Sequence, residues 1–162
     1  MDSVQNMLKA ARGNALAYRI ISNRFELQKQ KVEQGQNLDT DELELAFPSV
    51  LLLSFSCELY LKIIIIQKGL SYGKIHDLYG LYNILDEDIR CKIREYSEET
   101  DENEFVKILQ ENKDTFPEWR YFYEINLDKK PGNFAVVDAP FLDKLLRGLE
   151  KVTEELMDSL SQ

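Results

Sequence analysis

The segment from Leu51 to Leu70, LLLSFSCELYLKIIIIQKGL, constrains the fold more than any other part of this 162-residue chain. A helix drawn through it is apolar on almost every side, and such a helix is buried either in a protein core or in a membrane. Its length would suffice for a membrane span. However, Glu58 and Lys62 lie near its centre, where each charge costs roughly 2.5–3.5 kcal/mol on insertion. We therefore expect the central helix of a soluble bundle, with no membrane partner.

The composition indicates a single folded domain that spans residues 1–162. Hydrophobic residues make up 44% of the chain and charged residues 30%, as in soluble globular proteins. The net charge of −9 argues against binding to duplex DNA or to a membrane surface. The charge is uneven, however, because residues 1–34 hold more Lys and Arg than Asp and Glu, whereas residues 86–114 are acidic. One face could therefore still attract a polyanion.

Apolar residues recur at helical spacing through nearly the whole chain, which predicts an all-α fold. The predicted helices cover about residues 3–33, 41–69 or 48–69, and 75–85, followed by the segments LDEDIRCKIREYSEE, TDENEFVKILQEN, TFPEWRYFYEIN and DAPFLDKLLRGLEKVTEELMDSL. Asp residues at the starts of the later helices match the pattern of N-caps. Only LDKKPGNFAVV is expected to be extended. The predicted fold class is therefore all-α, a single helical bundle of about five to seven helices.

The sequence gives no indication of a metal site or a bound cofactor. Cys57 and Cys91 match no metal-ligand spacing, and the chain has a single histidine. The phosphate-binding motifs GxxxxGK[ST] and GxGxxG are absent. Two free thiols and an N-terminus, MDSVQNMLKAARGN, without an apolar signal region predict a cytoplasmic protein.

A narrow polar stripe runs along the apolar central helix. Ser54, Glu58 and Lys62 are spaced one turn apart, and a Glu four residues before a Lys is the favourable order for a helical ion pair. Charges on a core helix are tolerated only when they are paired and hydrogen-bonded. The stripe should therefore face a groove open to water or polar partners on other helices.

Two segments offer such partners. His76 lies in GKIHDLYGL, at the expected start of the third helix, and Arg120 lies in EWRYFYE, with Tyr121 and Glu124 close by. One interpretation is a structural network in which Glu58 pairs with a neighbouring cation. The other is a site at which a carboxylate, an amine, an imidazole and a guanidinium converge for binding or catalysis.

Three segments in order, SFSCELYLKIIIIQKGL, HDLYGLYNIL and WRYFYE, resemble motifs of the HEPN superfamily of small prokaryotic helical domains. The matched positions are Glu58, Lys62, His76, Arg120 and Tyr121. The resemblance implies an antiparallel helical bundle that forms homodimers, in a toxin–antitoxin or defence context or beside a nucleotidyltransferase partner. Many HEPN domains are metal-independent ribonucleases with an Arg four to six residues before a His. This chain lacks that spacing, because no Arg precedes His76 within six residues and no His follows Arg120.

The resemblance therefore leads us to expect a divergent HEPN-like domain that binds RNA or a protein partner, and whether it is an enzyme stays open. One alternative is a metal-independent endoribonuclease. In that enzyme His76 would be the general base for the 2′-hydroxyl, Arg120 or Lys62 would stabilise the charged phosphorane, and Glu58 would orient one of them. The other alternative is a module that binds only proteins.

Overall fold

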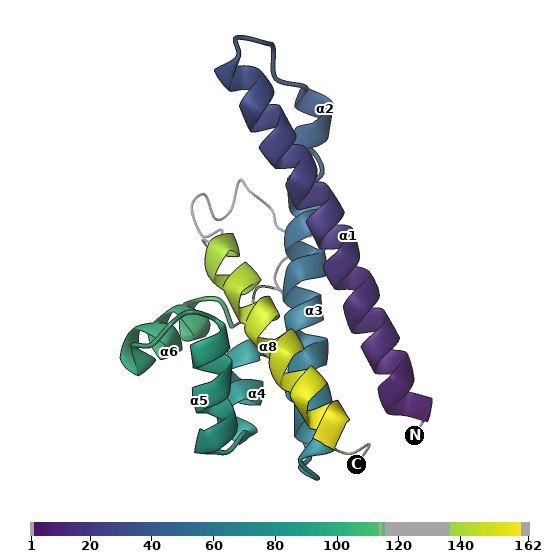
Figure 1. Ribbon diagram of the computed structural model, residues 1–162, viewed down its shortest axis with the longest axis vertical. Helices are drawn as coiled ribbons and strands as arrows, with labels where there is room; N and C mark the ends of the chain where they lie inside the picture. Colours follow the sequence, from purple (N-terminus) through teal and green to yellow (C-terminus); the bar gives the residue numbers. More distant parts are fainter. Residues whose placement is uncertain (1, 114, 116–136, 160–162) are drawn as a thin grey trace, which may run out of the picture.

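The computed structural model describes residues 2–113, 115 and 137–159, and every regular element in them is an α-helix (Figure 1). The all-α fold class is thus confirmed for the described part of the chain. The predicted helix in TFPEWRYFYEIN and the extended segment LDKKPGNFAVV lie almost entirely outside the described residues. The helices are α1 (Asp2–Glu33), α2 (Thr40–Leu43), α3 (Ala46–Gln67), α4 (Leu78–Ile84), α5 (Glu87–Tyr96), α6 (Glu102–Glu111) and α8 (Ala139–Ser159).

The apolar helix α3 lies at the centre of the bundle, with α1 along one side of it and α8 and α4 on the other (Figure 1). Together with α2 it is the one described stretch that is long and apolar enough to cross a membrane. However, 72% of its most apolar window is buried inside the protein, and a core helix of a soluble protein passes the same test. Its leucine and isoleucine side chains form the middle of the hydrophobic core.

The ends of α3 and α4 follow from local backbone chemistry. After α3, Gly69 adopts a φ of 71°, the left-handed conformation that commonly ends a helix and that glycine adopts without strain. The next helix starts later than the sequence pattern predicts, because Asp77 is its N-cap and accepts a hydrogen bond from the Gly80 amide at 2.6 Å. The expectation that His76 opens this helix is therefore wrong, since His76 precedes the cap.

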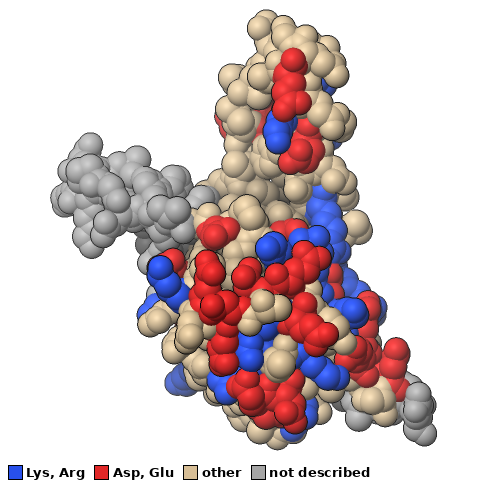
Figure 2. All heavy atoms as spheres, turned by 60° about the vertical axis from the view of Figure 1, so that its left-hand side comes forward, with Lys and Arg blue, Asp and Glu red and all other residues tan. Residues whose placement is uncertain are grey.

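Aspartate caps begin the later helices, as the sequence predicts. Asp86 accepts a hydrogen bond from the Ile89 amide at 3.0 Å at the start of α5, and Asp138 accepts one from the Phe141 amide at 2.9 Å beside α8. Each cap satisfies a backbone donor that the helix itself leaves unpaired, which typically contributes about 1 kcal/mol. Acidic side chains gather, interleaved with Lys and Arg, on the face that carries α5 and α6 (Figure 2).

Helices α5 and α8 approach each other closely at Gly148. A Cβ added there would lie 2.3 Å from the Ser97 hydroxyl oxygen and 2.8 Å from the Ile93 carbonyl oxygen. The Ile93 carbonyl belongs to the backbone and cannot rotate away. This contact therefore requires the absence of a side chain on α8.

We predict that Gly148→Ala lowers the free energy of unfolding by about 1–3 kcal/mol, because overpacking pushes α5 away from α8. The matched control is Gly13→Ala on α1, where an added Cβ meets nothing within 4 Å. That variant should be stabilised by about 0.5–1 kcal/mol through its better helix propensity. Urea denaturation of both variants measures the difference, and equal stabilities would contradict the close contact.

Candidate functional site

Three of the side chains singled out from the sequence converge beside α3. The Lys62 ammonium donates a hydrogen bond to Glu58 Oε1 at 2.6 Å, and the same oxygen lies 2.9 Å from His76 Nδ1. The Lys62 Nζ atom is also 3.1 Å from His76 Nδ1. We refer to these three residues as the Glu58–Lys62–His76 cluster.

Burial divides this cluster into a hidden part and an exposed part. The side chains of Glu58 and Lys62 are only 2% and 7% exposed, whereas that of His76 is 65% exposed. The Lys62 ammonium also lies 4.9 Å from the centre of the Tyr72 ring, a favourable cation–π distance. The cluster is therefore a buried ion pair that carries an imidazole at the protein surface.

The connection between α3 and α4 holds His76 in place. A turn closes where the Ile75 amide donates to the Tyr72 carbonyl at 3.0 Å, and the Leu78 amide donates to the Lys113 carbonyl at 3.1 Å. A Cβ at Gly80 would lie 2.7 Å from Asp77 Oδ2, so the capped first turn of α4 is tightly packed. Both ends of the short stretch around His76 are thus fixed to the bundle.

The imidazole can form these contacts in two tautomers. Nδ1 either carries the proton and donates a hydrogen bond, or lacks the proton and accepts a hydrogen bond. With the proton on Nδ1, His76 donates to Glu58 and Nε2 is left able to accept a proton. With the proton on Nε2, Nδ1 accepts from Lys62 instead. The first state has a carboxylate that orients an imidazole, which is the geometry of a positioned general base.

Glu58 has one further feature of interest. Its second oxygen, Oε2, is buried and has no hydrogen-bond partner among the described residues. Buried carboxylate oxygens are normally hydrogen-bonded. The cluster therefore holds a buried acceptor that the described part of the chain leaves unused.

The other predicted site residues are not part of the cluster as described. Ser54 lies on the same face of α3, but its hydroxyl donates to the Val50 carbonyl at 2.9 Å, within its own helix. Arg120, Tyr121 and Glu124 lie outside the described residues. No group of three or more potential metal ligands occurs in the ranges that the structure describes.

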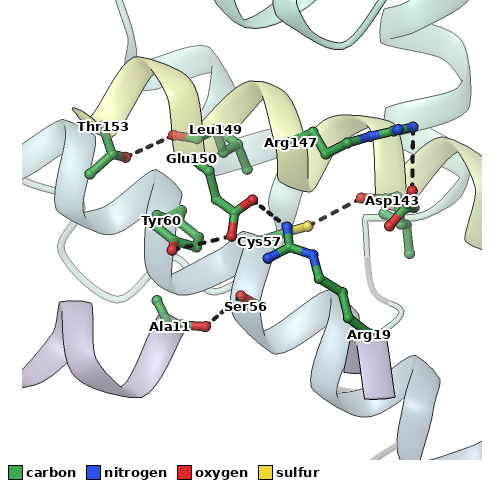
Figure 3. Close-up of polar contacts among 11 residues, drawn as sticks. Ala11, Arg19, Ser56, Cys57, Tyr60, Asp143, Arg147, Leu149, Glu150 and Thr153 are labelled. Atoms are coloured by element: carbon green, nitrogen blue, oxygen red, sulfur yellow. Dashed lines mark hydrogen bonds and ion pairs between the residues drawn. The ribbon is translucent and has the colours of Figure 1, made fainter. Parts of the chain in front are cut away.

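A second polar cluster joins α1, α3 and α8, and sequence reasoning missed it (Figure 3). Arg19 forms an ion pair with Glu150, and the Tyr60 hydroxyl donates to the same carboxylate at 3.5 Å. Burial raises the pKa of Tyr60 to about 12, and the negative charge of Glu150 adds to this rise. Nearby, the Ser56 hydroxyl donates to the Ala11 carbonyl at 2.9 Å. These contacts attach α1 and α8 to the central helix.

The buried thiol of Cys57 belongs to the same region of the core. It donates to the Leu142 carbonyl at 3.6 Å, and burial raises its pKa far above that of a free thiol. A thiol in this state is not a nucleophile. We therefore assign Cys57 a packing role.

Comparison of the chain with protein-family models, with curated proteins and with solved structures found no match in any of the three. The resemblance to the HEPN superfamily therefore stays a prediction that rests on the quoted motifs.

We predict that Lys62→Met destabilises the protein by about 3–5 kcal/mol, because it leaves the Glu58 carboxylate buried without its ammonium partner. The double variant Glu58→Leu/Lys62→Met removes both charges and should recover most of that loss. Chemical denaturation of the two variants and the wild-type chain gives the comparison. A double variant no more stable than Lys62→Met would show that the buried charge is not the cause.

The raised pKa of Tyr60 predicts a loss of stability in alkali. An unfolded tyrosine releases its proton near pH 10, whereas Tyr60 in the folded chain keeps it until about pH 12. Its contribution to stability is therefore complete below pH 10 and is lost as the pH rises towards 12. The melting temperature of the wild-type chain should fall more steeply above pH 10 than that of Tyr60→Phe. Equal slopes would contradict the shift.

Proposed function

We propose that this chain is an HEPN-like helical domain that binds RNA, and that the surface around His76 contacts the phosphate backbone. The observation that carries the proposal is an exposed imidazole held on a buried ion pair, Glu58 with Lys62. A binding role explains why the histidine faces solvent while both of its anchors are hidden.

A purely structural network would not need this arrangement. A buried ion pair gives little net stability compared with apolar side chains of the same size, because both charges lose their hydration. It is well suited to fix one polar group in a single orientation, as binding and catalytic sites require. The orientation of His76 by Glu58 therefore favours a functional surface over a sealed core network.

The local charge suits a polyanion despite the acidic chain. The connection that carries His76 contains two exposed lysines, Lys68 and Lys74, and its one acidic residue, Asp77, is used as the cap of α4. Lys68 pairs with Asp86 at 3.3 Å, but such an exposed pair is weak and screened by salt. Cationic side chains that contact phosphates supply most of the affinity for nucleic acids. The choice of RNA over other phosphate-bearing strands rests on the HEPN resemblance.

A second candidate function is metal-independent RNA cleavage, favoured by the 2.9 Å contact between Glu58 Oε1 and His76 Nδ1. With Nδ1 protonated, Nε2 would take the proton of a 2′-hydroxyl, whose oxygen attacks the adjacent phosphorus. The bond to the 5′-oxygen breaks, that oxygen takes up a proton, and a 2′,3′-cyclic phosphate remains. Cations near the phosphorane, for which the resemblance points to Lys62 and Arg120, would stabilise its charge.

The resemblance also implies a homodimer, an antiparallel arrangement of helices and a role in toxin–antitoxin or defence systems, in which the partner is RNA or a nucleotidyltransferase. We propose these properties together with RNA binding. The alternative is a module that binds only proteins, and the RNA-binding experiment below distinguishes the two.

We expect the wild-type chain to bind a fluorescently labelled single-stranded RNA in EDTA, measured by anisotropy over a range of salt concentrations. His76→Ala/Lys74→Ala should weaken binding by about tenfold and lower the salt slope by about one, because one phosphate contact is lost. Lys144→Ala on α8, a half-buried lysine whose ammonium lies 3.7 Å from Glu99, is the matched control and should bind like the wild type. No binding by the wild-type chain, or equal binding by the double variant, would refute the proposal.

The same mixtures, run on a denaturing gel, test cleavage. Product that ends in a 2′,3′-cyclic phosphate, and that is lost in a folded His76→Ala variant, would establish the endoribonuclease. Binding without any product would leave RNA binding as the function and remove the second candidate.

A further inference from the structure

The outer face of α1 carries three large aliphatic side chains that are exposed to water. Leu16, Ile20 and Leu27 are 60%, 54% and 57% exposed. At 3.6 residues per turn they lie within about 40° of one another around the helix. We call this row of side chains the α1 stripe.

The stripe points away from the bundle. Ala11 and Tyr18, which are buried, lie roughly 160–180° around the helix from it. The Ser56 hydroxyl on α3 donates to the Ala11 carbonyl, which marks the side of α1 that faces the core. Figure 1 shows α1 at the edge of the molecule, on the other side of α3 from α4. Exposed apolar side chains that share one face mark interaction sites more often than scattered ones do.

The charges beside the stripe are all of one sign. Lys9, Arg24 and Lys31 are exposed and lie within about 60° of its centre by helical spacing. Between Lys9 and Lys31 the one acidic residue of α1, Glu26, is about 100° away, and Asp2 lies two turns before Lys9 at the start of the helix. Along its own length the row is therefore flanked by cations of α1, and it is complementary to an apolar row flanked by anions.

A second copy of α1 does not meet that requirement. An antiparallel pairing that places Leu16 against Leu27 of the second copy also places Arg12 against its Lys31. A parallel pairing places each cation against its own equivalent. Like charges across an interface are unfavourable, so neither arrangement fits the charge pattern.

Nucleic acid and membrane fit less well than a protein helix. The stripe contains no aromatic side chain on which a base could stack. It extends over about 16 Å of helix, which is short for an anchor that lies on a lipid surface. Spacing at i, i+4 and i+11 instead matches the anchors by which one helix packs along another.

We propose that the α1 stripe binds an acidic amphipathic helix of another protein. The aliphatic side chains of that helix pack on Leu16, Ile20 and Leu27, and its carboxylates pair with Lys9, Arg24 and Lys31. The proposal is independent of RNA binding, because the stripe and the start of α4 lie on different sides of α3 (Figure 1).

The test measures binding of a labelled peptide of about 20 residues, roughly 30 Å of helix, with Leu on one face and Glu on the other. An isomer of the same composition, with its leucines scattered around the helix, is the peptide control. The full chain is compared with Leu16→Gln/Ile20→Gln/Leu27→Gln and with Lys9→Glu/Lys31→Glu. Their matched controls are Leu70→Gln, at an aliphatic position 41% exposed outside the stripe, and Lys29→Glu, on another side of α1.

We expect both stripe variants to bind the amphipathic peptide at least tenfold more weakly than the wild-type chain, and both controls to bind within twofold of it. Equal binding of the two peptide isomers, or no binding of either, would overturn the proposal. Light scattering that shows a wild-type dimer and a monomeric triple-Gln variant would assign the stripe to a second copy instead. Stripe-dependent sedimentation with phosphatidylcholine–phosphatidylserine vesicles would assign it to a membrane.

Discussion

The rotation of α3 within the bundle depends on one ion pair, Glu58 with Lys62. Because α3 is apolar on nearly all sides, hydrophobicity alone gives it no preferred orientation about its axis. The pair supplies one. Two charges that are almost completely buried must keep their 2.6 Å contact and must reach the few polar groups nearby, so this side of α3 has to face Tyr72 and His76. This orientation of α3 also sets the positions of α1 and α8, because both helices pack on the apolar sides of α3 that do not carry the ion pair.

The same pair links the core to the surface. His76 is exposed, yet both of its side-chain contacts are with buried groups. If the ring turned away, Glu58 Oε1 would lose a donor with the proton on Nδ1, and Lys62 would lose an acceptor with the proton on Nε2. The Asp77 cap and the close packing at Gly80 limit how far the backbone around His76 can shift. An exposed side chain held this firmly has lost the rotamer freedom that surface residues normally keep. A fixed orientation of this kind is what binding sites require, which supports the proposed role of His76.

Local sequence patterns predict most of the helices. They do not predict features that depend on backbone geometry or on contacts between segments far apart in the chain. The apolar period places α1 to within a residue of its observed start, and the Asp86 and Asp138 caps follow from residue type alone. The sequence pattern predicts the start of α4 too early, because His76 and Asp77 are adjacent and only the backbone shows that Asp77 is the cap. Arg19 has the pattern of a solvated cation, and its partner Glu150 is 131 residues away on α8, so nothing in either local sequence predicts the pair. The sequence does predict that the buried charges of Glu58 and Lys62 need polar partners, because a buried charge is costly without one. It offers His76 as one candidate for that role.

The distribution of charge separates two surfaces on one small bundle. Acidic side chains, interleaved with Lys and Arg, gather over α5 and α6 (Figure 2). Lys9, Arg24 and Lys31 lie on α1, and Lys68 and Lys74 lie between α3 and α4. In the proposed RNA complex a strand would be repelled by the first region and attracted by the second, so the acidic face would help to direct it towards His76. The α1 stripe lies on the other side of α3 from the start of α4 (Figure 1), so an acidic helix bound there would neutralise cations without covering the imidazole. Such a partner would therefore localise the domain and weaken its long-range attraction for RNA, while the geometry at Glu58 and His76 stays unchanged.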